Sequence, residues 1–344
     1  FILWIFLTDP QAAWSGASRN WVFTFVQLWI LAWLAGELLD TPQKHHVLMG
    51  VFAGVTLISA LFAIQEGEIG IDLDTSIRSE GLAGGANSAA RYFVVGLIFF
   101  VYLRNIANTG FKRLVVYSGI AILTFGVFMT VSRTGILLLF GAVGLMVLLP
   151  YQGRRRGQIL FIFGACFLAL WFFSDSILNI LSSIFPSIAH GTDTVGVRYG
   201  FWQAGIRMFL DNILFGVGIG RYSEVLPYYG WDLIPLRFLN STAHNMYIAL
   251  LSETGIVGFG LFLSMITFTF HGFVTAKKHL EGKDSTLVNF WMIVFIVMLI
   301  GGITKTDQAD KLLWLVIGLS SYFYKNYLIS FSEKDRELAQ AALQ

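Results

Sequence analysis

Charged side chains are scarce in this sequence of 344 residues. Asp, Glu, Lys and Arg make up 13% of the chain, whereas apolar residues make up 56% and aromatic residues 16%. A water-soluble domain carries about 25% charged residues, because its surface has to be solvated. The composition therefore excludes an ordinary soluble protein.

The sequence also has little net charge and little cysteine. The formal net charge is +2, and the single cysteine, Cys166, lies in an apolar run that is typical of an inert packing residue. A basic surface for nucleic acid, a disulfide framework and a cysteine-rich zinc site are excluded on these grounds. We expect no nucleic-acid partner.

The apolar residues fall in blocks that are long enough to cross a membrane. A helix rises about 1.5 Å per residue and the hydrocarbon core is about 30 Å thick, so roughly 20 apolar residues suffice. The predicted spans are 21–39, 46–64, 89–103, 114–132, 136–149, 158–173, 246–274, 287–303 and 312–330, preceded by a fragment at 1–7. We expect an all-α, polytopic transmembrane helical bundle with about ten spans present. Because residue 1 lies inside an apolar run without a methionine, we also expect a truncated N-terminus.

Lysine and arginine orient these spans, because cytoplasmic loops are enriched in both. The connections predicted to be cytoplasmic carry Lys44, Arg104, Lys112, Arg113, Arg154, Arg155, Arg156, Lys277, Lys278, Lys283, Lys334 and Arg336. The outer side carries mainly arginine, namely Arg19, Arg78, Arg91, Arg133, Arg198, Arg207, Arg221 and Arg237, against Lys305 and Lys311. Since a guanidinium group matches phosphate with two parallel donors, this set indicates an anionic ligand outside; ion-paired or interfacial arginines are the alternative.

One large segment, 174–243, lies outside the membrane in this topology. Its apolar residues recur with a helical period, with Trp202, Ile206 and Phe209 to Leu210 on one side, which favours helices lying on the membrane interface. The predicted parts of the chain are N-terminal transmembrane helices at 1–173, the large outer loop at 174–243, C-terminal transmembrane helices at 244–330 and a cytoplasmic tail at 331–344.

His244 stands where the outer loop re-enters the membrane, at the start of an apolar run. A histidine at a helix start is often only a polar cap. An ionisable residue at membrane depth is nevertheless a functional candidate, and neutral imidazole can accept a proton from a hydroxyl group. We therefore take His244 as a candidate general base.

Two arginines are candidates for binding an anion. Arg133 lies in the turn Ser132-Arg133-Thr134 between two apolar runs, which offer no carboxylate as a local partner, so a distant side chain or a ligand phosphate has to pair with it. Arg198 precedes the glycine run Gly216, Gly218 and Gly220. No strand precedes that run and its spacing is not that of a dinucleotide-binding loop, so we interpret its glycines as turn residues.

These motifs, taken in order, resemble one known family. The Ser132-Arg133 turn, Arg198 with Trp202 four residues on, LFGVGIGRY at 214–222 and AHNMYIALLSETGIVGFG at 243–260 are similar to the O-antigen ligase (Wzy_C-type) superfamily of bacterial membrane glycosyltransferases, over roughly residues 75–275. The resemblance implies about twelve spans in the full chain and one large periplasmic helical loop. It also implies transfer of a glycan from undecaprenyl pyrophosphate to an acceptor hydroxyl in the periplasm, without a metal or other cofactor.

The resemblance assigns roles to individual residues. His244 would be catalytic, and Arg133 and Arg198 would bind the donor pyrophosphate. Supporting roles are expected for Arg78, Arg91, Arg221 and Asn245. The segment after Arg78 has Ala86-Asn87-Ser88 where family members have Asn-Pro-Asn. Asp72 and Asp74 are the alternative for a weak divalent metal site.

The expected protein is thus an O-antigen ligase in the bacterial inner membrane, with its active site facing the periplasm. Its partners would be the undecaprenyl-pyrophosphate-linked donor, a lipid A-core or other glycan acceptor, and membrane lipids. An O-antigen or exopolysaccharide polymerase of the same superfamily is the nearest alternative, and a protein O-oligosaccharyltransferase is a third. A membrane transporter is the alternative of another class, although its usual signs, paired repeats and charges at the midplane, are not found.

Overall fold

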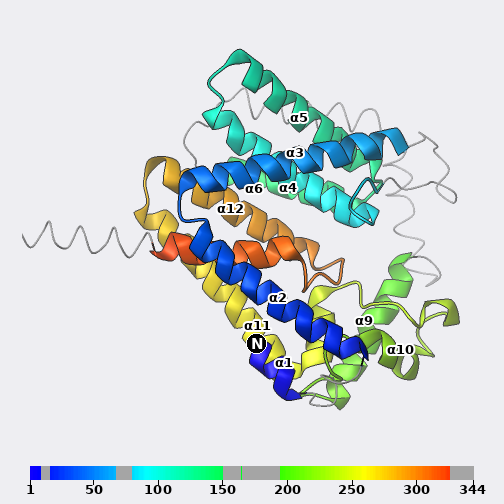
Figure 1. Cartoon of the computed structure of the whole chain (residues 1–344). Helices are drawn as coiled ribbons and strands as arrows, with labels where there is room; N and C mark the ends of the chain where they lie inside the picture. The colour runs from blue at the N-terminus through cyan, green and yellow to red at the C-terminus, as the bar shows by residue number, and fades with distance from the viewer. Residues whose placement is uncertain (9–15, 67–79, 150–163, 165–193, 326–344) are drawn as a thin grey trace, which may run out of the picture. The chain divides into compact units, whose positions relative to one another are not determined.

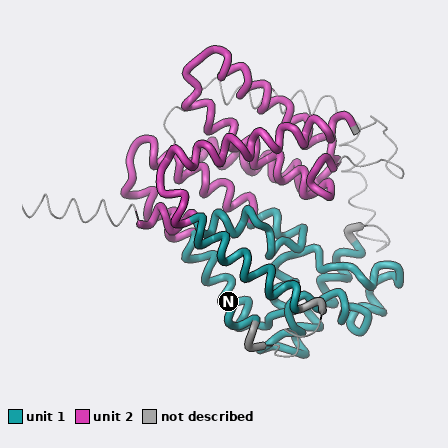
Figure 2. Tube along the Cα trace, viewed as in Figure 1, with its two compact units in different colours: residues 1–35, 180–269, 299–318 teal, residues 36–179, 270–298, 319–344 magenta. Residues whose placement is uncertain are grey.

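The computed structural model describes residues 1–8, 16–66, 80–149, 164 and 194–325, and the secondary structure of these residues is helical (Figure 1). The chain divides into two compact units (Figure 2). Unit 1 contains residues 1–35, 180–269 and 299–318, and unit 2 contains residues 36–179, 270–298 and 319–344. Each unit is considered by itself.

The helices have the following bounds: α1 Ile2–Thr8, α2 Gly16–Leu38, α3 Pro42–Glu66, α4 Ala86–Ile106, α5 Gly110–Met129, α6 Arg133–Leu148, α9 Thr194–Asp211, α10 Tyr222–Gly230, the 3-10 turn η1 Leu236–Phe238, α11 Met246–His279 and α12 Gly282–Gly301. Residues 311–325 are also helical.

Six helices are long and apolar enough to cross a membrane: Arg19–Leu38, Pro42–Gln65, Ala86–Ile106, Gly110–Met129, Met246–His279 and Gly282–Gly301. Each overlaps a predicted span, so the expectation of an all-α polytopic membrane protein is confirmed.

The number of about ten spans stays a prediction. It depends on segments that are shorter than these six helices or that lie outside the described residues. Helix α6 has 16 residues, which is short of a full crossing. Residues 158–173 lie outside the described residues apart from residue 164, and the last predicted span is described only as far as residue 325.

In unit 2, α4 packs against α3, α5 and α6. Small residues allow these close approaches. A side chain at Gly96 would meet Thr56 of α3 and Leu123 of α5, and one at Gly119 would meet the ring of Phe100. Lipid is as apolar as leucine, so helices in a membrane associate through such close packing and not through a hydrophobic driving force.

In unit 1, α9 and α10 share a small core. Its members from α9 are Val197, Phe201, Ala204 and Met208, which recur every three or four residues, and its other members are Tyr222, Leu226, Ile234, Ala243 and Ala249. The side of α9 that carries Ile206 and Leu210 is exposed instead, at 37% and 59%. The core lies on the other side of α9, and Gly200 lets the backbone of Leu233 approach that helix closely.

Helix α11 is interrupted at Gly255, whose φ of 66° and ψ of −172° are not helical. An interruption leaves carbonyl groups before it and an amide group after it without partners inside the helix. In a membrane-spanning helix each such group costs several kcal/mol if it stays unpaired. The break therefore requires partners from another part of the chain.

The segment 213–222 and Trp4 supply these partners. The bonds are Val217 N–H to the Ser252 carbonyl at 2.9 Å, Gly218 N–H to the Glu253 carbonyl at 3.0 Å, Ile256 N–H to the Ile213 carbonyl at 2.8 Å, and the Trp4 indole N–H to the Thr254 carbonyl at 3.0 Å. The motif LFGVGIGRY and the LSETG part of the motif at 243–260 are therefore one structural element.

Glycine is required on both sides of this element. Gly216, Gly218 and Gly220 all have positive φ, at 72°, 101° and 76°, which confirms their interpretation as turn glycines. A side chain at Gly216 would overlap the backbone of Glu253, and one at Gly255 would overlap the backbone of Leu214.

The carboxylate of Glu253 completes the element. This side chain is 3% exposed, and its Oε1 atom accepts the backbone N–H of Tyr222 at 3.1 Å, while Gly220 donates a further backbone hydrogen bond to the carboxylate. Tyr222 is the first residue of α10, so Glu253 caps the N-terminus of that helix.

We expect Gly255→Ala to lower the free energy of unfolding by about 1–3 kcal/mol, because alanine is strained at positive φ. Overlap with the Leu214 backbone adds to this cost. Gly260→Ala is the matched control in the same helix, since nothing lies within 4 Å of the added carbon there. Thermal unfolding of both variants in detergent measures the difference, and equal stabilities would contradict the role given to the break.

Candidate functional site

His244 lies directly before α11 in an unusual backbone conformation. Its φ is 48°, and among the described residues only Val131 shares a positive φ without being glycine. Such conformations cost about 1–3 kcal/mol and persist where the surrounding structure enforces them, which is common at functional sites.

The residue after His244 fixes this conformation. Asn245 is 8% exposed, and its side-chain oxygen accepts the backbone N–H groups of Tyr247 at 2.9 Å and Ile248 at 3.1 Å. Asn245, predicted as a supporting residue, is thus the N-cap of α11. It acts on the site by holding the helix start next to His244.

Helix α9 approaches His244 from the side of the shared core. Ala243 and Phe201 are both in that core, and the rings of Phe201 and His244 are 5.6 Å apart between centroids. Arg198 lies one turn before Phe201 on the same helix, and its positive charge acts on the imidazole ring. Arg198 is therefore close enough to His244 for its charge to lower the pKa of the imidazole, although 45 residues separate them.

Lys305 is the second cation that acts on His244. Sequence analysis counted it only as one of two outer lysines and missed it as a site residue. No local motif could have identified it, because its position depends on how the end of α12 meets the start of α11. The backbone N–H of Met246 donates to the carbonyl of Gly302 at 2.7 Å, and the Tyr247 hydroxyl donates to the carbonyl of Leu299 at 2.8 Å.

These surroundings keep the His244 imidazole neutral. Burial lowers its pKa below the ordinary value of about 6.5, and the charges of Arg198 and Lys305 lower the pKa further. A neutral imidazole has one nitrogen able to accept a proton at physiological pH. The residue is thus prepared for proton acceptance in a region that attracts anions.

Arg133 lies in unit 2, at the start of α6. Ser132 caps this helix by accepting the Gly135 N–H at 3.1 Å, and its hydroxyl donates to the side chain of Asn87 at 2.7 Å. A side chain at Gly135 would collide with Ala90 of α4. The Arg133 turn therefore lies against the segment 86–91, which ends at Arg91.

Arg91 is 2% exposed, and its guanidinium carbon lies 5.3 Å from the centre of the Tyr92 ring. Because Arg133 and Arg91 belong to unit 2 and Arg198 and His244 to unit 1, the predicted convergence of Arg133 with His244 stays a prediction. Arg78 lies outside the described residues.

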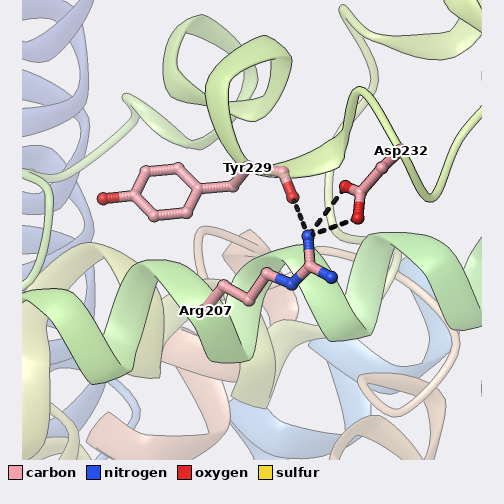
Figure 3. Close-up of polar contacts among 3 residues, drawn as sticks. All are labelled: Arg207, Tyr229 and Asp232. Carbon is pink, nitrogen blue, oxygen red and sulfur yellow. Dashed lines mark hydrogen bonds and ion pairs between the residues drawn. The ribbon is translucent and has the colours of Figure 1, made fainter.

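Several other outer arginines have partners within the protein. Figure 3 shows the guanidinium group of Arg207 pointing at both carboxylate oxygens of Asp232, at 2.7 and 3.0 Å, and at the carbonyl of Tyr229 at 3.3 Å. Arg221, predicted as a supporting residue, pairs with Glu224 at 3.4 Å. For Arg207 and Arg221, the alternative interpretation of ion-paired arginines therefore holds.

Among the described residues, no group of three or more His, Cys, Asp or Glu side chains is arranged to hold a metal ion. Asp72 and Asp74, the weak candidate pair, lie outside the described residues.

We expect the His244 imidazole to titrate below pH 6.5, so that it is neutral at physiological pH and becomes protonated only as the pH falls. Arg198→Gln removes a neighbouring positive charge and should raise this pKa. NMR titration of isotopically labelled histidines, with the signal assigned through His244→Gln, measures both values. A titration midpoint above 6.5, or one that Arg198→Gln leaves unchanged, would contradict this electrostatic account.

Comparison with known proteins finds a family that is similar to part of the chain. The family described as Wzy_C, O-Antigen ligase, matches residues 118–263, a range that includes Arg133, Arg198 and His244. A solved structure from work entitled "Structural coordination of polymerization and crosslinking by a peptidoglycan synthase complex" is similar at 13% sequence identity and a TM-score of 0.47, covering 94% of each chain. No curated protein matches the chain. Residues 118–263 of this membrane protein are therefore similar to the Wzy_C O-antigen ligase domain family.

Proposed function

We propose that this protein is an O-antigen ligase, which transfers a glycan from undecaprenyl pyrophosphate to a hydroxyl group of a lipid A-core acceptor. The transfer takes place at the periplasmic face of the inner membrane and needs no metal. Similarity to the Wzy_C family supports a lipid-linked glycan transferase. The single observation that supports the proposal further is the setting of His244, which has a strained backbone conformation and an imidazole pKa that burial, Arg198 and Lys305 lower.

The proposed reaction is a displacement at the first sugar of the donor. The acceptor oxygen bonds to the anomeric carbon, the bond from that carbon to the pyrophosphate oxygen breaks, and the bonding electron pair leaves with the pyrophosphate. His244 takes the proton of the acceptor hydroxyl. A general base placed in this way contributes typically 10²–10⁴-fold to a rate.

Arg198 and Arg133 neutralise the charge that develops on the leaving pyrophosphate. Cations held in advance by the fold stabilise such charge strongly where water is excluded, since they need no reorganisation during the reaction. Helix α9 holds Arg198 through the core that it shares with α10, and the cap at Ser132 holds the turn of Arg133. A planar guanidinium fork suits phosphate better than an ammonium group does.

A polymerase of the same family would use the same donor chemistry and add the glycan to another lipid-linked glycan. The roles proposed for His244, Arg198 and Arg133 are the same in both enzymes, so this alternative differs only in the acceptor. The family match favours glycosyl transfer over transport, the alternative of another class.

We expect Arg198→Ala to lower the transfer rate by about 10²–10³-fold, since one stabilising donor is lost, and Arg198→Lys to recover part of it. Arg207→Ala is the matched control on the same helix, because its guanidinium is paired with Asp232. The rates are measured on purified protein with a lipid-linked glycan donor and a lipid A-core acceptor. Equal rates for Arg198→Ala and Arg207→Ala would exclude the proposed role of Arg198.

A further inference from the structure

The short segment 303–310 between α12 and the last described helix is held next to the start of α11. Gly302, directly before it, accepts the backbone N–H of Met246, and a side chain at Gly302 would meet Met246. At its other end, Asp310 accepts the N–H groups of Leu312 at 2.9 Å and Leu313 at 3.3 Å and so caps the following helix. The segment is therefore fixed at both ends.

Within this segment, Lys305 faces both protein and water. Its Nζ atom lies 3.4 Å from a carboxylate oxygen of Asp307, and its side chain is 37% exposed whereas that of Asp307 is 8% exposed. The buried carboxylate orients the ammonium group. The exposure of the lysine leaves the ammonium group accessible to a ligand from solution.

Two further features around the segment suit an anion. The ammonium of Lys305 and the guanidinium of Arg198 both act on the His244 ring, so positive charge reaches the imidazole from two separate elements. The hydroxyl oxygen of Thr306 is buried and has no hydrogen-bond partner among the described residues. A buried hydroxyl group without a partner is uncommon, and an anionic oxygen would satisfy it.

We propose that Lys305 is a further binding residue for the donor pyrophosphate, acting with Arg198 on the anionic group next to His244. This inference rests on the proposed function. Lys305 would bind as a point charge on a flexible stem, in contrast to the fixed fork of Arg198. It can therefore follow the pyrophosphate as the bond to the sugar breaks.

The test uses inorganic pyrophosphate as the probe and the full chain, purified in detergent, as the receptor. We expect Lys305→Gln to weaken pyrophosphate binding about tenfold, because a hydrogen bond to a charged group is lost. Lys305→Arg should keep affinity within a few-fold. Lys311→Gln, an exposed lysine six residues further along, is the matched control and should bind as the wild type does. Thermal unfolding verifies that the variants are folded.

The second readout is the titration of His244, which tests whether the ammonium group of Lys305 acts on the imidazole ring. Lys305→Gln should raise the pKa of His244, and Lys311→Gln should leave it where it is. The inference is overturned if Lys305→Gln binds pyrophosphate as tightly as Lys311→Gln does. Its failure is distinct from failure of the proposed function: in the first case Arg198→Ala still weakens pyrophosphate binding, whereas in the second neither Arg198→Ala nor Lys305→Gln changes it.

Discussion

The break in α11 at Gly255 is the constraint on which the rest of unit 1 depends. Backbone groups within a membrane need partners from the protein, because lipid offers none. The segment 213–222 provides them and is itself held by the Glu253 carboxylate, which caps α10. Helix α10 in turn packs against α9, the helix that carries Arg198. The break in α11 is therefore connected, through the segment 213–222 and α10, to the helix that carries Arg198.

His244 has an unusual backbone conformation and an imidazole with a lowered pKa. The Asn245 cap and the bond from Met246 to Gly302 fix the helix start, and they enforce a backbone conformation that histidine does not favour by itself. The core that α9 shares with α10 brings Arg198, and the bond from Met246 to Gly302 brings Lys305, close enough to lower the pKa of the imidazole. A histidine with a strained backbone and a lowered pKa near two cations suits proton acceptance next to an anionic leaving group.

Sequence reasoning identified the features that depend on local pattern. The length of the apolar runs predicted the six helices that could cross a membrane. The glycine run predicted the turn at 216–220. Sequence reasoning could not identify the ion pair of Arg207, because the fold brings Asp232 to that guanidinium group from 25 residues away. It could not place Arg198 near His244 either, because that depends on the core that α9 shares with α10. Lys305 was not identified from the sequence, because its closeness to His244 follows from the hydrogen bond between the Met246 N–H and the Gly302 carbonyl, which no motif encodes.

The most direct measurement is a transfer assay on the purified protein, with a lipid-pyrophosphate-linked glycan as the donor. Two acceptors are offered, a lipid A-core and a second lipid-linked glycan, and both products are analysed. The account predicts glycan on the lipid A-core and release of undecaprenyl pyrophosphate. It also predicts that His244→Ala slows the reaction by roughly 10²–10⁴-fold. Glycan added to the lipid-linked acceptor alone would make the protein a polymerase. Wild-type transfer rates in His244→Ala would contradict the central claim that this histidine accepts the acceptor proton.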